Sequence, residues 1–147
     1  MTIRRATPDD LDVIVAMALR FQATTSYAQH LRATEATFRA LATQLLASPE
    51  AAIWVADRDG QVVGMIAAAL YTQPMSGERI GSEVCWWMDP EARGGRTAIR
   101  LVRAAEQWAQ AQGATVFQMM APTKAVGALY EALQYAPIET HYMRRLS

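Results

Sequence analysis

The sequence has one cysteine, one lysine and no net charge. Because Cys85 has no second cysteine to pair with, the chain can form neither an internal disulfide nor a thiolate metal cluster. Its 14 basic residues balance 14 acidic ones, and without an excess of positive charge we expect neither nucleic acid nor a membrane surface as a partner. Apart from Lys124 the basic residues are arginines. Arginine suits phosphate recognition, although a coding bias toward arginine explains the same skew.

Long apolar segments are also missing. Nothing in residues 1–5 resembles the apolar part of a secretory signal, and the longest apolar run, Val62 to Leu70, is far too short to cross a bilayer. The two histidines lie outside any cysteine or carboxylate pattern that would indicate a metal site. These absences predict a cytoplasmic protein that uses no metal.

The apolar content is sufficient for one folded unit. The chain has 147 residues, of which 52% are hydrophobic, and this length is typical of a single domain. No repeat, linker or low-complexity tail divides it. We therefore predict one domain over residues 1–147.

Capping residues and apolar periodicity predict four helices. Thr7-Pro8 marks the beginning of the first and Thr34 the beginning of the second, which Ser48-Pro49 ends. Apolar residues at helical spacing should form the buried stripes. The stripe of the second helix comprises Phe38, Leu41, Leu45 and Leu46, and that of the third Leu101, Ala104, Ala105 and Trp108. The third and fourth helices are expected at about Thr97 to Gln112 and Lys124 to Gln134.

The remaining apolar runs predict six strands and an α/β fold that contains an antiparallel hairpin. Asp59-Gly60 indicates the turn of that hairpin, because both positions tolerate positive φ. In the fourth strand, alternation places Glu83 and Cys85 on the face opposite Val84. The expected strands are Ile3–Ala6, Ile53–Ala56, Val62–Tyr71, Glu83–Met88, Thr115–Met120 and Ile138–Leu146, with a loop from Thr72 to Gly81.

The most informative segment runs from Met88 to Ala98. A strand ends, a turn with Gly94 and Gly95 follows, and a helix begins. Free N–H groups at a helix start bind anions, and glycines let a phosphate approach the backbone. Arg93 and Arg96 add positive charge at the same place. An ordinary tight connection between a strand and a helix produces the same pattern, so the segment by itself leaves both interpretations open.

This segment resembles the acetyl-CoA signature of the Gcn5-related N-acetyltransferases, Arg/Gln-x-x-Gly-x-Gly/Ala. Arg93 takes the first place and Ala98 the last. Arg96 stands where the family usually has its middle glycine, so either the loop is displaced or Arg96 adds a phosphate contact. Residues 129–135 resemble a second family segment, Leu-Tyr-Glu-x-Leu-Gly-Phe, in which Gln134 replaces the glycine.

The resemblance implies a mixed, mostly antiparallel central sheet flanked by about four helices. It also implies an N-acetyltransferase with acetyl-CoA as co-substrate, a primary amine of a small molecule or a protein as acceptor, and, as in many members, a homodimer. The strand backbone would bind the pantetheine arm and the turn the pyrophosphate. The implied cofactor-binding residues are Trp87 and Met88 for the arm, and Arg93, Gly94, Gly95, Arg96, Thr97 and Ala98 for the pyrophosphate.

The same resemblance indicates candidate catalytic residues. A free alkylamine with a pKa near ~10.4 must lose a proton before it attacks, and Glu83 lies where several members have a catalytic glutamate. Tyr130 matches the tyrosine of the second segment and would protonate the leaving thiolate. A solvated carboxylate and a purely packing tyrosine are the alternatives. Ser26 and Tyr27 are acceptor-side candidates by family position alone.

The sequence is also compatible with other interpretations. The chain is either an enzyme, a non-catalytic acyl-CoA-binding domain, or a structural or interaction protein without a nucleotide ligand. Cys85 is either an inert strand residue or a nucleophile paired with His30 or His141. Trp86 and Trp87 belong either to the core or to the wall of an acceptor pocket.

Overall fold

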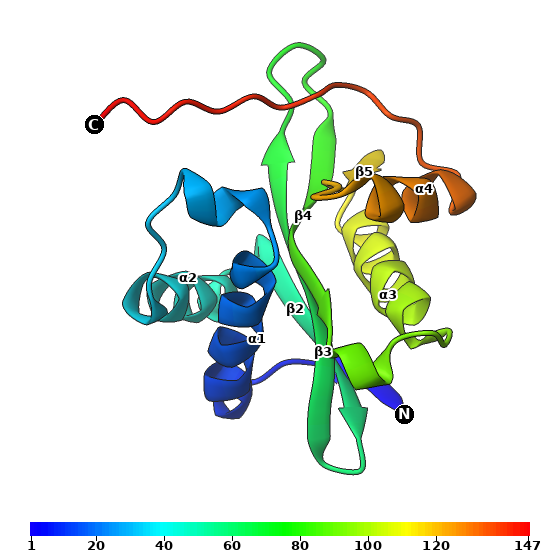
Figure 1. The fold of residues 1–147 in the computed structure, drawn as a ribbon. Coiled ribbons are helices and arrows are strands. Elements are labelled where there is room, and N and C mark those ends of the chain that lie inside the picture. Colours follow the sequence, from blue (N-terminus) through cyan, green and yellow to red (C-terminus); the bar gives the residue numbers. More distant parts are fainter.

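A five-stranded sheet with the order β1-β2-β3-β4-β5 forms the centre of the computed structural model, which describes residues 1–147 (Figure 1). The first four strands are antiparallel to their neighbours, and β5 pairs parallel to β4. This is the mixed, mostly antiparallel sheet that the sequence predicts. The strands are β1 Thr2–Arg5, β2 Ala51–Arg58, β3 Gln61–Thr72, β4 Arg79–Met88 and β5 Val116–Gln118.

Four α-helices cover the two faces of this sheet. Helices α1 and α2 lie on one face and α3 on the other, and α4 lies beside α3 near β5 (Figure 1). Each face has its own buried apolar cluster, so the sheet separates two halves of the core. None of the helices combines the length and apolar character needed to cross a membrane. The helices are α1 Leu11–Ala23, α2 Glu35–Ala47, α3 Thr97–Ala111 and α4 Lys124–Ala132, with 3-10 turns η1 Pro8–Asp10, η2 Ser26–Gln29 and η3 Pro90–Ala92.

A carboxylate joins the first strand to the first helix. Asp10 accepts a hydrogen bond from the Thr7 N–H at 2.8 Å and two from the Arg4 guanidinium at 2.9 Å each. The Arg4 hydrogen bond lowers the pKa of Asp10 against the opposing effect of burial. The start that Thr7-Pro8 predicts is therefore a 3-10 turn that leads into α1.

The β2–β3 hairpin turns at the residues that the sequence indicates. Asp59 and Gly60 have φ angles of 51° and 87°, the left-handed values that a two-residue hairpin turn requires. Asp57 supports the turn because its Oδ1 accepts a hydrogen bond from the Gly60 N–H at 2.7 Å.

The fourth strand begins at Arg79, so the prediction of a loop up to Gly81 and a strand from Glu83 is wrong. Gly81 is part of β4 rather than of a turn. A Cβ at this position would lie 2.7 Å from Phe117 Cδ2 and 2.8 Å from Ala109 Cβ. The glycine thus permits β5 and α3 to approach the strand closely, a requirement that sequence patterns do not reveal.

A bulge in β4 changes which side chains share a face. Glu83 and Cys85 are opposite neighbouring residues of β3, which leaves Val84 without a partner. As a result Glu83, Val84 and Cys85 all line one cavity. The expectation that Val84 faces the opposite side is therefore wrong, because one inserted residue interrupts the two-residue alternation.

The sixth strand expected at residues 138–146 is absent, since no helix or strand follows α4. The segment runs across the end of the β3–β4 pair toward α2 (Figure 1), and Arg145 Nη1 donates to the His30 carbonyl at 3.0 Å. Ile138, Tyr142 and Leu146 are 87%, 86% and 90% exposed. Alternating apolar residues form a strand only where a partner strand accepts their peptide hydrogen bonds.

Candidate active site

Strands β4 and β5 separate to leave an open edge in the sheet. Their parallel pairing covers only Ile80 to Ser82 of β4. Beyond this point β4 continues to Met88, while the chain after β5 leads away to α4 (Figure 1). The side of β4 that faces away from β3 therefore has no strand partner from Glu83 onward.

The peptide groups of Met88 lie on this open edge. The N–H of Asp89 donates to the Val63 carbonyl of β3 at 2.9 Å, so the Met88 carbonyl of the same peptide group points the opposite way. There it accepts a hydrogen bond from Arg93 Nε at 2.9 Å. The N–H and carbonyl of one extended residue share a side, which places the Met88 N–H on the open edge and the peptide groups of Trp87 on the β3 side.

Arg93 folds back on the strand instead of extending into solvent. Besides its bond to Met88, its guanidinium carbon lies 4.9 Å from the centroid of the Trp87 ring. The indole Nε1 of Trp87 donates to Asp89 Oδ1 at 2.8 Å, and Arg20 reaches the same oxygen at 2.9 Å. These contacts fix the turn that leads from β4 toward α3.

The start of α3 presents a row of free N–H groups. Those of Gly94, Gly95 and Arg96 have no hydrogen-bond partner in the chain, and those of Thr97 and Ala98 belong to the first helical turn, which has no intrahelical acceptor for them. No side chain caps the helix. Gly94 has a φ of 90°, and a Cβ at either glycine would meet nothing within 4 Å. This open, donor-rich turn suits a phosphate.

Arg96 adopts a conformation that does not require glycine. Its φ of −77° and ψ of −8° are right-handed helical, so a Cβ causes no backbone strain, and its side chain is exposed beside the free N–H groups. The next two arginines of the helix are engaged elsewhere: Arg100 donates to the Met1 carbonyl at 3.1 Å and Arg103 to Glu106 at 2.8 Å. Arg96 is therefore the helix-start arginine that is free to meet an anion.

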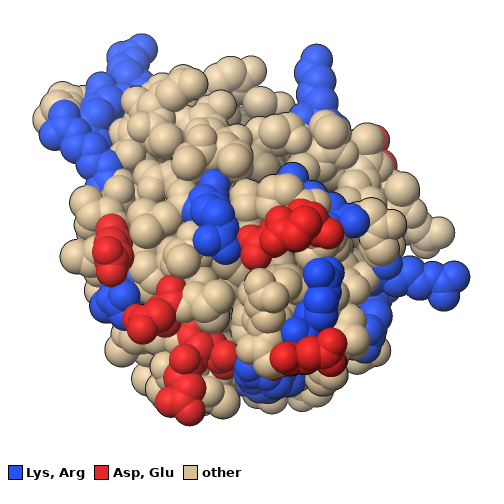
Figure 2. All heavy atoms as spheres, turned by 60° about the horizontal axis from the view of Figure 1, so that its bottom comes forward, with Lys and Arg blue, Asp and Glu red and all other residues tan.

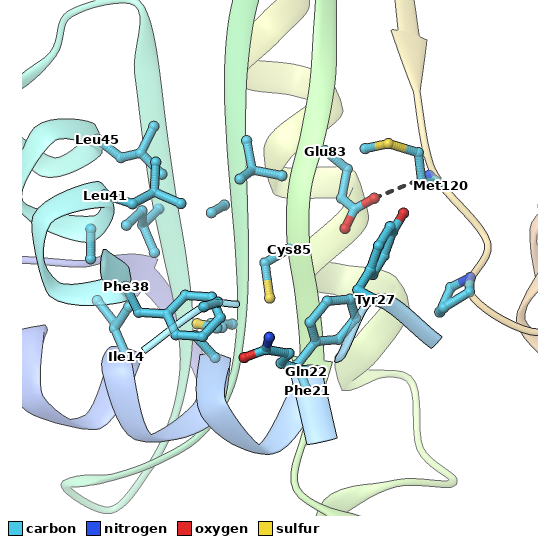
Figure 3. A pocket seen from close by; sticks show the side chains of 18 of the residues that line it. Ile14, Phe21, Gln22, Tyr27, Phe38, Leu41, Leu45, Glu83, Cys85 and Met120 are labelled. Carbon is cyan, nitrogen blue, oxygen red and sulfur yellow. Dashed lines mark hydrogen bonds between the residues drawn. The ribbon is translucent and has the colours of Figure 1, made fainter. Parts of the chain in front are cut away.

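Glu83 is a buried acid at the base of the gap between β4 and β5. It is 4% exposed, and its Oε2 accepts a hydrogen bond from the Met120 N–H at 3.1 Å (Figure 3). Burial raises the pKa of Glu83 to about 7, and the hydrogen bond from Met120 opposes part of that rise. Near neutral pH the carboxyl group is thus present in both protonation states, as a general base requires.

Tyr130 reaches the same point from α4. Its side chain is buried, its hydroxyl donates to the Met120 carbonyl at 3.1 Å, and its ring stacks on Trp86 with centroids 5.7 Å apart. Burial first, and then the negative charge of Glu83, raise the pKa of the phenol above its ordinary value. The hydroxyl therefore remains protonated at neutral pH.

A cavity of about 250 Å³ lies on the α1–α2 face of the sheet, with Glu83 at one side (Figure 3). Sixteen of its 19 lining residues are hydrophobic, and Glu83 is the only charged one. Phe38, Leu41 and Leu45 of α2 line it. Phe38, Leu45 and Leu46 also pack, partly buried, against the α1-side core, so the expected buried stripe is wrong at Leu41, which is 39% exposed. The apolar stripe of α2 faces the cavity, and sequence periodicity does not distinguish a cavity wall from a closed core.

The acceptor-side candidates from the sequence have different surroundings. Tyr27 of η2 lines the cavity, and its hydroxyl end points toward Glu83 and Met120 (Figure 3). Ser26 is exposed and is not among the lining residues. Met120, whose backbone N–H and carbonyl contact the two candidate catalytic side chains, was not predicted from sequence because only its backbone takes part.

The alternatives for Cys85 and the tryptophans are decided by burial. Cys85 lines the cavity, but burial and the charge of Glu83 raise the pKa of its thiol, which opposes a role as a thiolate nucleophile. Trp87 packs in the α1-side core and Trp86 against the α3-side core, and neither lines the cavity. No group of three histidine, cysteine or acidic side chains is placed to hold a metal ion.

Charge on the outer surface is mixed. On the face drawn in Figure 2, basic and acidic side chains alternate without a large patch of one sign. This face therefore concentrates no field of a single sign, in agreement with the zero net charge.

A split pair of strands, an amide-lined helix start and a buried acid thus lie around one apolar cavity and one open strand edge. The sequence matches the model of the acetyltransferase (GNAT) family over residues 16–135, and the chain belongs to this family. The protein is an acetyl-CoA-dependent N-acetyltransferase. No curated protein sequence matches the chain significantly.

Solved structures share the whole fold at low sequence identity. The aminoglycoside acetyltransferase AAC(6')-Iy, in complex with a bisubstrate analogue of CoA, is 16% identical with a TM-score of 0.82, and the match covers 99% of this chain and 97% of that one. An aminoglycoside 6'-N-acetyltransferase from Acinetobacter haemolyticus is 22% identical with a TM-score of 0.78 over 100% of both chains. A ribosomal-protein-alanine N-acetyltransferase from Brucella melitensis biovar Abortus 2308 is 21% identical with a TM-score of 0.73, covering 99% and 100%.

Proposed function

We propose that the protein acetylates a primary amine by direct attack on the thioester, with Glu83 as general base and Tyr130 as general acid. The observation that carries this proposal is the pair of backbone contacts at Met120, whose N–H donates to Glu83 and whose carbonyl accepts from Tyr130. One residue thereby holds a proton acceptor and a proton donor at the end of the gap between β4 and β5.

The turn and the strand edge supply the groups that would hold acetyl-CoA. The free N–H groups from Gly94 to Ala98 and the exposed side chain of Arg96 would bind the pyrophosphate. The Met88 N–H on the open edge would bind the pantetheine arm or the thioester carbonyl. Arg93 and Trp87, which the sequence also assigns to the cofactor, would act by fixing the turn through their contact with each other and with Met88.

Glu83 would receive the proton of the incoming amine. Its pKa of about 7 is far below that of a free alkylammonium ion but high enough for efficient proton transfer near neutral pH. The carboxyl group lines the cavity and also reaches Met120 at the strand gap. It therefore lies between the space for an acceptor and the open edge of β4.

Tyr130 would donate a proton to the leaving sulfur. Acetyl-CoA supplies the acetyl group as a thioester, so a C–N bond forms while a C–S bond breaks. The phenol keeps its proton because burial raises its pKa, and rotation of the hydroxyl away from the Met120 carbonyl would free that proton for donation. Tyr27 and Ser26 would bind the acceptor, Tyr27 inside the cavity and Ser26 outside it.

Calorimetric titration with acetyl-CoA, followed by an assay of thiol release with a panel of primary amines, tests this function. We expect binding in the micromolar range and amine-dependent thiol release. Binding without release for any amine would favour the non-catalytic acyl-CoA-binding alternative. The absence of binding at millimolar acetyl-CoA would contradict the assignment of the turn as a pyrophosphate site.

We also propose a homodimer that uses the C-terminal segment. The exposed side chains of Ile138, Tyr142 and Leu146 and the unpaired outer edge of β5 support it, because an exposed edge and apolar side chains favour pairing with a second chain. Light scattering should give twice the chain mass for the full protein and the single mass for a chain ending at Pro137. A full-length monomer would contradict the proposal.

We place the enzyme in the cytoplasm. A sequence with a single cysteine, and therefore no internal disulfide, supports this location because disulfides are concentrated in oxidising compartments. Cell fractionation should recover the protein with cytoplasmic markers, and its recovery in another compartment would contradict the assignment.

A further inference from the structure

The cavity beside Glu83 combines one acid with walls that are otherwise uncharged. Gln22 and Tyr27 are the polar neutral groups that line it. The opposite wall is formed by side chains of α2, among them Phe38 and Leu45. An occupant of this space can place one cationic or amine group at Glu83, and the rest of it must tolerate an apolar environment, since an unpaired charge there costs several kcal/mol or more.

The cavity is large enough for a ring or a short aliphatic chain. An apolar cavity of roughly 150 Å³ holds benzene, whereas this one measures about 250 Å³. Its rim includes Leu31 and Leu41, which are 46% and 39% exposed. Apolar side chains exposed at the entrance of a cavity indicate that an apolar ligand enters and covers them.

The positive charges near this entrance argue against a polycation. Arg145 of the C-terminal segment donates to the His30 carbonyl at 3.0 Å, next to the lining residue Leu31, and the following residue Arg32 is exposed. Glu35, the only acid on α2, is paired with Arg39 at 3.0 Å. A ligand with several ammonium groups would find one partner, Glu83, and would meet cations outside.

We infer that the acceptor is a small monoamine with an uncharged apolar body, of the arylalkylamine or alkylamine class. This inference rests on the proposed function. The amine lies at Glu83, where it loses its proton, and the apolar body fills the cavity against α2. Binding then derives from apolar contact, and the single charge is removed at the carboxylate before the C–N bond forms.

A series of primary amines tests this inference by kcat/KM, measured as thiol release at saturating acetyl-CoA. From propylamine to hexylamine we expect a rise of roughly fourfold per methylene, the value for complete burial of each group. 2-Phenylethylamine should equal or exceed hexylamine. Spermidine and kanamycin, each with several ammonium groups, should be at least about 100-fold poorer because their additional charges have no partners.

A matched pair of variants tests whether the apolar body of the amine binds in the cavity. Leu41→Glu places a charge at the rim and should lower kcat/KM for hexylamine at least tenfold, with unchanged acetyl-CoA affinity. Met75→Glu makes a comparable change at a residue that is 90% exposed in the β3–β4 turn, and should leave both values unchanged. Circular dichroism and melting temperature verify that both variants fold.

Three results would overturn the inference: rates independent of chain length, a preference for spermidine or kanamycin, or equal effects of the two variants. Each leaves the proposed function intact, because it still requires acetyl-CoA turnover. The failure of the proposed function has a different signature, namely no calorimetric binding of acetyl-CoA or no thiol release with any amine.

Discussion

Glu83 and Tyr130 are bound to the two sides of one residue, since the N–H of Met120 donates to the Glu83 carboxylate and its carbonyl accepts from the Tyr130 hydroxyl, each at 3.1 Å. The two side chains come from β4 and α4, 47 positions apart in the sequence. The segment after β5 thus fixes the separation between the proposed base and the proposed acid, and the two roles can be tested individually.

Replacing Glu83 by glutamine should remove the base. The substitution keeps the shape and an acceptor oxygen for the Met120 N–H, and kcat/KM should fall by roughly 10²–10⁴. The wild-type rate should rise with pH through an apparent pKa near 7, because the carboxylate is the active form. The pH profile measured by thiol release should lose this limb in the variant. A variant that retains the limb would assign the titration to another group.

Replacing Tyr130 by phenylalanine should affect turnover more than binding. It removes the hydroxyl and leaves the ring stacked on Trp86, so kcat should fall by about 10² while the KM for acetyl-CoA changes less than about threefold. The limb near pH 7 should persist, in contrast to the glutamine variant at position 83. Urea titration gives the cost of the lost hydrogen bond, about 1 kcal/mol. An unchanged kcat would assign Tyr130 to packing alone.

The raised pKa of Glu83 also predicts a pH dependence of stability. The folded protein holds this proton up to about pH 7, whereas the unfolded chain releases it near 4.5. The contribution is therefore complete below pH 4.5 and decreases as pH rises through 7, by on the order of 1–3 kcal/mol. Asp10 has a lowered pKa and acts in the opposite direction at lower pH, so the informative quantity is the difference between wild type and Glu83→Gln. That difference, from urea unfolding at pH 5 and pH 8, should favour the variant at pH 8. A difference independent of pH would contradict the assignment.

Arg96, which stands in place of the family's middle glycine, should contribute to phosphate binding. Arg96→Ala removes an exposed charge next to free N–H groups, and we expect acetyl-CoA to bind about 5–30-fold more weakly at low salt, with the difference shrinking as ionic strength rises. Arg100→Ala is the matched control, since that side chain is bonded to the Met1 carbonyl. Calorimetry at two salt concentrations measures both. Equal effects of the two substitutions would indicate only a general loss of charge.

Gly81 of β4 should be required for close packing, whereas Gly95, in the turn before α3, should not be. Gly81→Ala would place a Cβ 2.7 Å from Phe117 and 2.8 Å from Ala109, which should cost about 1–3 kcal/mol of unfolding free energy. Gly95→Ala introduces a methyl group with nothing within 4 Å and should change stability by less than about 1 kcal/mol. Urea denaturation of the two variants measures this contrast, and a tolerated alanine at position 81 would mean that β5 and α3 shift readily.

Capping residues and turn residues correctly predict the structural elements that depend only on neighbouring residues. Thr34 caps α2 through its side chain, Asp59-Gly60 forms the hairpin turn, and the glycine turn after Met88 leads into α3 as expected. Capping and turn geometry depend on a few neighbouring residues, so they can be derived without the tertiary structure. The same holds for the donor-rich start of α3, which is the part of the site that the sequence predicts best.

The incorrect structure predictions concern segments whose conformation depends on residues far away in the sequence. The bulge at Val84 turns a third side chain toward the cavity, Gly81 lies within a strand because β5 and α3 approach it, and residues 138–146 pair with no strand. Each outcome depends on what lies beside the segment in space, which a pattern of apolar residues does not specify.

The sequence by itself determined the family, the glycine-containing turn that leads into α3 and the ionisable character of Glu83 and Tyr130, because these depend on residue type and on short-range spacing. The tertiary structure alone decided that Met120 brings the two side chains together, that burial raises the pKa of Glu83 to about 7, and that the apolar stripe of α2 lines a cavity as well as packing on the core. Burial, proximity and empty space are properties of the folded chain, and no single segment contains them.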